Sequence, residues 1–388
     1  MRRLTFIYIS LLASILSSSL ISAQNKEGTS IIPYELIKGK MIVKMEINGS
    51  VEKFIFDTGA ATSSLEPSFC RAHNMAIVDS MNIRDASNLL SNYRQVVIQS
   101  LRTPDRMFNF KDIKAILHPE NSIFGCFDGV IGLIGSDILQ NLICTIDSKQ
   151  AIISLTNSTK PLNESLRYAH NFTAKSILPI LAMQINGEIV SNCLFDTGAG
   201  GFLSLKKEVF NELNTKNALS TQRVGYGASH VGLSGIMEVD TSLLVKMENI
   251  RIGPFKIKSA YAETANVPYT LIGTTILNYC KVVIDYQRRR IYFLPYSEEA
   301  VAIPSRFADI GISIKDGNLI ISNVWDSCKS AVNPGDIITH VNGEPIGKYD
   351  MCDIIRGVAL LNGNDSKVLK VLTKDGTTKD VVYEFKDF

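Results

Sequence analysis

One sequence pattern occurs twice in this chain: two apolar runs joined by Asn-Gly, the second of which ends in Asp-Thr-Gly. The first copy is residues 41–56 followed by Asp57-Thr58-Gly59, and the second is residues 180–195 followed by Asp196-Thr197-Gly198. An Asn-Gly pair between two apolar runs predicts a tight β-hairpin. Each copy therefore predicts a hairpin whose second strand presents one aspartate on a tight loop.

The duplication extends beyond the tripeptide. Residues 132–139 match residues 270–277, so that Gly135 corresponds to Gly273, and strands that end in Asp147 and Asp285 follow. The two copies of the tripeptide aspartate, of the glycine and of the strand-ending aspartate are 139, 138 and 138 residues apart. A spacing this constant indicates an internal duplication.

The length and the local patterns predict the fold class. A chain of 388 residues is too long for one ordinary core, so we expect two or three domains. Each repeated unit consists of short strands and turns, with brief helical patterns such as residues 135–141. We therefore predict an all-β fold in which two similar barrels pack together.

These motifs resemble those of the aspartic peptidases. The resemblance rests on Asp-Thr-Gly-Ala after an apolar run, followed later by two apolar residues and glycine; in this sequence these are residues 56–60 with 133–135, and residues 195–199 with 271–273. The short repeat and the Ile-Gly-x-x-Ile-Leu segment are most similar to the retropepsin-like branch. The resemblance implies two retropepsin-like lobes, residues 24–160 and 167–297.

The same resemblance implies an active site. Asp57 and Asp196 would form a catalytic dyad that shares one proton, because two carboxylates so close cannot both ionise. One carboxyl would act as base on a water molecule and the other as acid toward the scissile carbonyl, and the pair titrates as a unit, so neither role is assigned to one residue. The implied supporting residues are Thr58, Gly59, Thr197, Gly198, Gly135 and Gly273.

The residue after each tripeptide leads to a hypothesis about pH. A hydroxyl at position 60 or 199 could donate a hydrogen bond to the dyad and lower its pKa. Both positions are alanine, Ala60 and Ala199. We expect an activity optimum nearer neutral pH than that of strongly acid peptidases.

A flap over the substrate is a further expectation from the family. In the second unit, Gly225, Tyr226 and Gly227 are the candidate flap, because mobile glycines and a covering tyrosine suit a lid. An ordinary glycine-rich turn with an exposed tyrosine fits them equally well. The corresponding first-unit stretch, residues 83–93, has no glycine.

Other polar candidates have structural interpretations. Asp147 and Asp285 precede polar turns, so we interpret them as turn-capping residues. The seven cysteines are too few for a dense disulfide framework, and structural thiols are favoured, with Cys193 a buried one. The five histidines lack metal-ligand spacing, so the sequence implies no metal and no cofactor.

Residues 303–388 form a third, strand-rich module. Residues 333–338 (Asn-Pro-Gly-Asp-Ile-Ile) and 341–343 (Val-Asn-Gly) are similar to the turns of bacterial PDZ domains. The resemblance implies a groove helix over residues 351–361, closing strands over 368–372 and 381–385, and a groove for a peptide or protein C-terminus. The amides near Ile310, Gly311 and Ile312 would receive the carboxylate. A packing domain with a closed groove is the alternative.

The first residues have the pattern of a signal peptide. Arg2 and Arg3 precede an apolar run over residues 4–16, and residues 21–23 offer a cleavage site, so residues 1–23 are expected to be removed. An uncleaved membrane anchor is the competing interpretation. We expect an exported protein, periplasmic or secreted, with no transmembrane segment after signal removal. Without the two arginines the chain has 38 basic and 38 acidic residues, so charge implies neither nucleic acid nor anionic membrane as partner.

The sequence thus predicts an exported aspartic endopeptidase that binds polypeptide between its lobes and recruits polypeptide through the PDZ module. A serine peptidase would need a motif such as Gly-x-Ser-x-Gly, and residues 232–235 are one residue short of it. A non-catalytic peptide-binding protein on the same scaffold remains the alternative, although it would need neither Asp57 nor Asp196.

Overall fold

A computed structural model describes residues 27–84, 90–119, 123–160, 169–173, 176–227, 231–232, 235–236, 239–326, 331–363 and 365–387. The expected signal peptide lies outside these residues, as do part of the first-unit stretch 83–93, part of residues 232–235, and Cys328. In the part of the chain that is described, no helix is long and apolar enough to cross a membrane.

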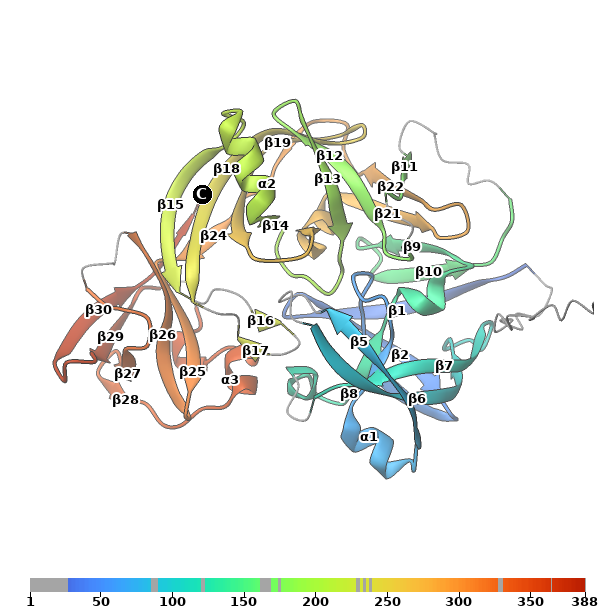
Figure 1. Cartoon of the computed structure of the whole chain (residues 1–388), viewed down its shortest axis with the longest axis horizontal. Coiled ribbons are helices and arrows are strands. Elements are labelled where there is room, and N and C mark those ends of the chain that lie inside the picture. Colours follow the sequence, from blue (N-terminus) through green and yellow to red (C-terminus); the bar gives the residue numbers. More distant parts are fainter. Residues whose placement is uncertain are drawn as a thin grey trace, which may run out of the picture.

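The fold is all-β and contains two closed six-stranded barrels, followed by a smaller C-terminal domain (Figure 1). In the first lobe, the strand order β2-β3-β8-β4-β7-β6 closes through pairing of β6 with β2. Its elements are β1 (Thr29–Ile37), β2 (Lys40–Ile47), β3 (Ser50–Phe56), β4 (Ser64–Leu65), α1 (Pro67–Ala72), β5 (Ile77–Arg84), β6 (Leu90–Arg102), β7 (Asn109–Leu117), η1 (Ile123–Cys126), β8 (Val130–Ile134), η2 (Ser136–Leu139), β9 (Ile143–Asp147) and β10 (Ile152–Thr156).

The second lobe repeats this topology strand for strand. Its order β12-β13-β20-β14-β19-β18 closes through pairing of β18 with β12. Its elements are β11 (Ala169–Asn171), β12 (Ile180–Ile185), β13 (Glu188–Phe195), β14 (Leu203–Lys206), α2 (Lys207–Thr215), β15 (Ser220–Gly227), β16 (Val231–Gly232), β17 (Gly235–Ile236), β18 (Asp240–Ile252), β19 (Phe255–Ala265), β20 (Thr270–Ile272), η4 (Thr274–Asn278), β21 (Cys280–Asp285) and β22 (Arg290–Pro295).

Both expected hairpins are confirmed. Ile47 pairs with Ser50 and Ile185 with Glu188, so each turn has two central residues. The Asn-Gly residues of each turn have positive φ, 48° and 95° at residues 48–49 and 48° and 88° at residues 186–187. Positive φ at both positions is the turn that matches the twist of paired strands, and asparagine and glycine adopt it at low cost.

An antiparallel pair, β9 with β21, joins the two lobes within the sheet order β11-β22-β21-β9-β10-β1. Thr145 faces Val283 at the centre of this pair, and the two positions are 138 residues apart, the spacing of the duplication. The lobes are therefore related by an approximate twofold axis through this pair. The two copies of the sequence are related in space by this twofold rotation, which brings their equivalent loops face to face.

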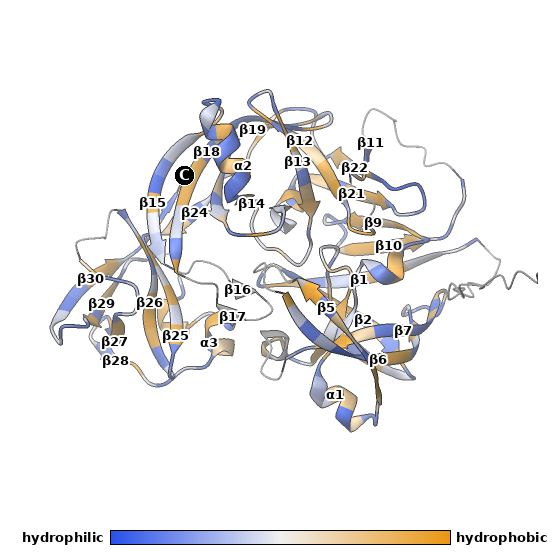
Figure 2. Cartoon of the chain, viewed as in Figure 1, coloured by the Kyte–Doolittle hydropathy of each residue, from blue (hydrophilic) through white to orange (hydrophobic). Residues whose placement is uncertain are grey.

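The apolar core runs through both lobes without interruption. It includes Phe56 of β3 and Phe195 of β13, each fully buried and each the residue before a tripeptide aspartate. The Phe195 ring meets that of Phe293 edge-on, with centroids 5.7 Å apart. Figure 2 shows hydrophobic residues alternating with hydrophilic ones along many strands, as expected when one face of a strand is buried.

The C-terminal domain has its own core, centred on fully buried side chains such as Ile310, Leu319 and Leu369. The expected turns are present, with Asn342 and Gly343 at φ 51° and 85° between two strands. Its elements, which follow β23 (Val301–Ala302), are β24 (Arg306–Ala308), β25 (Ile310–Lys315), β26 (Asn318–Trp325), β27 (Ile337–Val341), β28 (Glu344–Pro345), α3 (Met351–Arg356), η6 (Ala359–Leu361), β29 (Lys367–Leu372), β30 (Thr378–Tyr383) and β31 (Phe385–Asp387).

The helix of this domain is shorter than the sequence predicts. The predicted helix spans residues 351–361, whereas α3 ends at Arg356 and a separate 3₁₀ turn begins at Ala359. Gly357 has a φ of 88° and Val358 is extended, so the backbone leaves the helical conformation between the two segments. Glycine permits this break because it has no Cβ to clash at positive φ.

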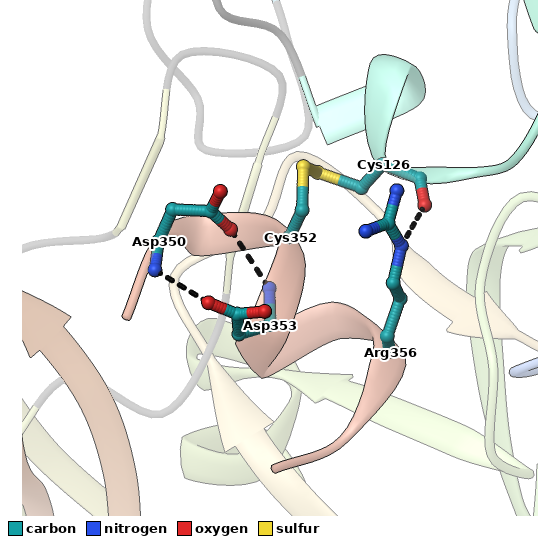
Figure 3. The surroundings of a disulfide bond; sticks show 5 residues. All are labelled: Cys126, Asp350, Cys352, Asp353 and Arg356. Carbon is teal, nitrogen blue, oxygen red and sulfur yellow. Dashed lines mark hydrogen bonds between the residues drawn. A yellow bond between two sulfur atoms is a disulfide. The ribbon is translucent and has the colours of Figure 1, made fainter. Parts of the chain in front are cut away.

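One disulfide, Cys126 to Cys352, joins η1 of the first lobe to α3 of the C-terminal domain (Figure 3). The two cysteines are 226 residues apart, so no spacing in the sequence could indicate the bond. The sequence favours structural thiols and leaves the pairing of the cysteines open. The other described cysteines are free and buried: Cys70, Cys144, Cys193 and Cys280.

Candidate active site

Each tripeptide aspartate directly follows a strand that pairs, in parallel, with a strand that ends just before a support glycine. The Asp57 N–H donates to the carbonyl of Ile134 at 2.9 Å, and the Asp196 N–H donates to that of Ile272 at the same distance. Ile134 and Ile272 directly precede Gly135 and Gly273. The glycine segments therefore run immediately beside the loops, as the resemblance implied.

The two threonines brace the loops against each other across the lobe boundary. Thr58 N–H donates to Thr197 Oγ1 at 3.0 Å, and Thr197 N–H donates to Thr58 Oγ1 at 3.1 Å. Each hydroxyl also donates to a main-chain carbonyl of the opposite lobe at 2.8 Å, Thr58 to Phe195 and Thr197 to Phe56. Both threonines are fully buried. These four bonds hold the two aspartates in a symmetric arrangement.

The glycines of the tripeptides allow the two carboxyl groups to approach. A Cβ at Gly59 would lie 2.3 Å from the Asp196 carboxyl, and a Cβ at Gly198 would lie 2.3 Å from Asp57 Oδ2. Any larger residue would clash at both positions. Each carboxyl therefore packs against the backbone of the opposite tripeptide, and the two meet on the approximate twofold axis.

Gly135 and Gly273 have a similar steric role behind the loops. A Cβ at Gly135 would lie 2.9 Å from the carbonyl oxygen of Ala60, and one at Gly273 would lie 2.7 Å from that of Gly200. All eight predicted dyad and support residues are thus brought together.

The electrostatics of the pair favour one shared proton over two ionised carboxylates. Burial raises the pKa of Asp196 well above its ordinary range, and the negative charge of Asp57 and a hydrogen bond to it raise that pKa further. Main-chain N–H groups also differ between the loops: Asp57 Oδ1 accepts from Gly59 at 2.8 Å and from Ala60 at 3.2 Å, whereas Asp196 Oδ1 accepts from Gly198 at 2.8 Å.

Lys40 is a site residue that sequence reasoning missed. Its ammonium donates to the carbonyl oxygen of Gly198, and its charge partly offsets the raised pKa of Asp196. Lys40 begins β2 of the first lobe, beside a turn at Gly39 whose carbonyl accepts from Thr274 Oγ1 at 3.3 Å. The sequence offers no signal for this contact, because it depends on the docking of one lobe against the other.

A second missed feature is a buried polar network behind the first loop. Ser136 Oγ donates to the Thr58 carbonyl at 2.9 Å and lies 3.0 Å from the hydroxyl of Tyr286, whose pKa is raised by burial. Asp137 accepts from Ser63 N–H at 2.9 Å and from Ser63 Oγ at 2.7 Å. Burial raises the pKa of Asp137 despite these bonds.

The candidate flap residues lie in a β-strand that is paired on both sides. Gly225, Tyr226 and Gly227 are the last residues of β15, and they pair with β18 on one side and with β26 of the C-terminal domain on the other. Tyr226 is half exposed. A Cβ at Gly225 would lie 2.8 Å from the Trp325 ring, so this glycine makes room for the indole.

The residues expected to bind a carboxylate in the C-terminal domain lie in a strand. Ile310, Gly311 and Ile312 begin β25, which pairs with β26 and has a register shift between Gly311 and Ile312. In contrast, Asp147 and Asp285 cap turns, as expected: Asp147 accepts from the Lys149 N–H at 3.1 Å and Asp285 from the Arg288 N–H at 2.9 Å. Among the described residues, no cluster of histidine, cysteine and acidic side chains could hold a metal ion.

Solved structures include chains that are similar to this one. No protein-family model matches the chain, and no curated protein matches it. A crystal structure of a retropepsin-like aspartic protease from Rickettsia conorii is similar at 20% sequence identity, over 34% of this chain and 92% of that chain, with a TM-score of 0.26.

Proposed function

We propose that this chain is an aspartic endopeptidase in which Asp57 and Asp196 activate water for attack on a peptide bond. The observation that carries the proposal is the pair of symmetric loops, braced by four threonine hydrogen bonds, that holds two carboxyl groups in contact. One chain supplies both loops, so the proposed site is complete without a second copy.

The proposed mechanism starts with the shared proton on Asp196, because the pKa of that carboxyl is raised by burial and by the charge of Asp57. Asp57 takes a proton from a water molecule as the water oxygen attacks the carbonyl carbon, and Asp196 gives its proton to the carbonyl oxygen. The tetrahedral diol then collapses: Asp57 protonates the amide nitrogen, the C–N bond breaks, and a diol hydroxyl returns its proton to Asp196. The products are an acid and an amine, and the dyad regains its single proton.

Substitution of either aspartate tests this proposal. The chain without residues 1–23 and its Asp57→Asn and Asp196→Asn variants are compared on an unstructured protein across pH. Loss of at least about a hundredfold in cleavage rate is expected for both variants, the scale of general acid–base catalysis. Asp112→Asn, an exposed aspartate of β7, is the control and should cleave at the wild-type rate.

Equal cleavage by the wild type and both dyad variants would refute the proposal. Tight binding of peptides with no cleavage by the wild type would instead support the alternative, a non-catalytic peptide-binding protein.

We further propose that the C-terminal domain is a PDZ domain that recruits polypeptide. In support, β25 pairs with β26 alone among the described strands, which leaves its other edge for an added strand. Ile312 of β25 and Ile354 of α3 both pack on the core of this domain, and α3 contacts β25. Labelled peptides with a free or an amidated C-terminus, titrated into the Asp57→Asn variant, test the proposal, because only the free carboxylate should bind well.

We also propose export of the protein, to the periplasm or outside the cell, with removal of residues 1–23. The disulfide between Cys126 and Cys352 supports this proposal, because disulfides persist in oxidising compartments. Sequencing of the mature N-terminus tests it. A chain that begins at residue 24 is expected, whereas a retained Met1 would contradict cleavage.

A further inference from the structure

A continuous series of hydrogen bonds runs from the second lobe to the carboxyl group of Asp57. Tyr286, which directly follows β21, places its hydroxyl 3.0 Å from Ser136 Oγ. Ser136 Oγ donates to the Thr58 carbonyl at 2.9 Å. The peptide group that contains this carbonyl donates its N–H, which belongs to Gly59, to Asp57 Oδ1 at 2.8 Å. We call the four residues from Tyr286 to Gly59 the Tyr286 network.

Every hydrogen in the Tyr286 network is donated toward the carboxyl group. A serine hydroxyl has one hydrogen, and that of Ser136 is donated to the Thr58 carbonyl. The Tyr286 hydroxyl must therefore be the donor in its bond with Ser136 Oγ. Burial raises the pKa of Tyr286, so its hydroxyl keeps its hydrogen well above neutral pH.

A series with this direction strengthens its last bond. A peptide group whose carbonyl accepts a hydrogen bond becomes a stronger donor at its N–H, because hydrogen bonds in series polarise one another. Ser136 and Thr58 are fully buried and Tyr286 is nearly so, which means that water screens the series little. A stronger donor at Asp57 Oδ1 stabilises the charged form of that carboxyl.

The corresponding hydroxyls of the other sequence copy point elsewhere. Thr274 corresponds to Ser136, and Ser148 corresponds to Tyr286, each at the 138-residue spacing of the duplication. Their hydroxyls donate to main-chain carbonyls outside the second tripeptide, those of Gly39, at 3.3 Å, and Leu277. Each uses its single hydrogen there, so neither can supply the second dyad loop with the equivalent bond.

Other titratable groups face the two ends of the Tyr286 network. At the tyrosine end, the charges of Cys144 and Asp137 would raise the pKa of Tyr286 further, which also favours the neutral hydroxyl. At the carboxyl end, burial and the charge of the partner carboxyl raise the pKa of Asp196, whereas the charge of Lys40 lowers it. Lys40 therefore opposes the network, and the test leaves this lysine unchanged.

We propose that Tyr286 is a positioning residue that makes Asp57 the base of the dyad. Through Ser136 it orients and strengthens the N–H group that faces Asp57 Oδ1, so the dyad carries its negative charge mainly on Asp57. The inference rests on the proposed peptidase function. It gives a physical reason why two carboxyl groups from equivalent loops take different roles.

The pH dependence of kcat/KM provides the first test. Tyr286→Phe and Ser136→Ala should each move the acid limb to higher pH, by about 0.3–0.5 pH unit, because the charged form of the base loses support. Ser136→Thr keeps the hydroxyl and should keep the wild-type limb. Tyr296→Phe is the matched control and should also keep it, because the Tyr296 hydroxyl lies 3.2 Å from Ser148 of the other lobe, outside the Tyr286 network.

The double variant Tyr286→Phe/Ser136→Ala tests whether the two hydroxyls act in series. It should move the acid limb no further than Ser136→Ala does alone, because both hydroxyls act through one peptide group. Additive shifts, or a limb that neither single variant moves, would overturn the inference.

NMR of isotope-labelled aspartate carboxyl carbons tests the inference without cleavage. In Asp196→Asn the remaining dyad carboxyl is Asp57, and addition of Tyr286→Phe should raise its titration midpoint. In Asp57→Asn the remaining carboxyl is Asp196, and the same addition should leave its midpoint in place. Equal shifts in both backgrounds, or a shift in neither, would overturn the inference. The expected NMR shifts without Asp57-dependent cleavage would support the network and count against the peptidase function alone.

Discussion

The cross-bonded threonines lead to a quantitative prediction for Thr58→Val. Valine keeps the shape of threonine but removes the hydroxyl, which donates to the Phe195 carbonyl at 2.8 Å and accepts from the Thr197 N–H at 3.1 Å. Thr58, Phe195 and Thr197 are all fully buried, so water cannot replace the lost partner. Two main-chain groups are left unpaired, at about 1–3 kcal/mol each, so the free energy of unfolding should fall by about 2–6 kcal/mol.

Thr58→Ser is the matched variant, because it keeps the hydroxyl and removes only a methyl group. Its expected cost is about 1 kcal/mol, the value of one buried methylene-sized group. Urea unfolding followed by far-ultraviolet circular dichroism compares the two variants, and the rate of peptide cleavage measures the effect on the dyad. The valine variant should be the less stable of the two and should lose most of its activity.

The reasoning would be refuted if Thr58→Val were as stable as Thr58→Ser and equally active. The duplication supplies an internal check. Thr197 makes the equivalent bonds from the other lobe, at 3.0 Å and 2.8 Å, so Thr197→Val should lose a similar free energy of unfolding. A large difference between the two valine variants would show that the two halves of the brace are not equivalent.

Four further predictions concern the dyad and the disulfide. Lys40→Met should move the alkaline limb of the pH–rate profile to higher pH, because the Lys40 charge lowers the pKa of Asp196; Lys40→Arg should leave that limb in place. Asp196→Asn should make the protein more stable than wild type at neutral pH, with a gain that shrinks as pH falls toward 4. The reason is that a carboxyl whose pKa is raised in the folded state destabilises the folded protein as pH rises. Urea titrations at several pH values would show a constant difference between the two proteins if the pKa were not raised. Reduction of the disulfide, or Cys126→Ser, should lower the free energy of unfolding by at most about 5 kcal/mol, from the entropy of closing a loop across 226 residues; an unchanged urea midpoint would contradict this contribution. Wild-type cleavage should peak above about pH 4, and Ala60→Ser should shift the acid limb of its pH profile downward; a wild-type peak below that value would contradict the role assigned to the missing hydroxyl.

The local pattern of residues determined much of the fold and of the dyad. The Asn-Gly turns, the alternating strands and the constant spacing of the duplication are properties of neighbouring residues, so the hairpins and the two-lobed all-β fold could be predicted. The dyad loops could be located as well, because each glycine that permits close approach lies two residues after an aspartate in the same tripeptide. Even the reciprocal threonine bonds follow once two copies of one loop are related by a twofold axis.

Only the tertiary structure determined which contacts are made by the residues that differ between the two copies or lie outside them. Lys40 reaches Gly198 across the lobe boundary, Cys126 and Cys352 meet from positions 226 residues apart, and Ile355 of α3 packs against an apolar cluster of the first lobe. Each of these contacts joins segments whose separation in the sequence follows no repeat, so no sequence pattern predicts it. A duplicated sequence determines a symmetric pair of loops, and contacts that the duplication does not repeat, such as that of Lys40 with Gly198, make their surroundings asymmetric.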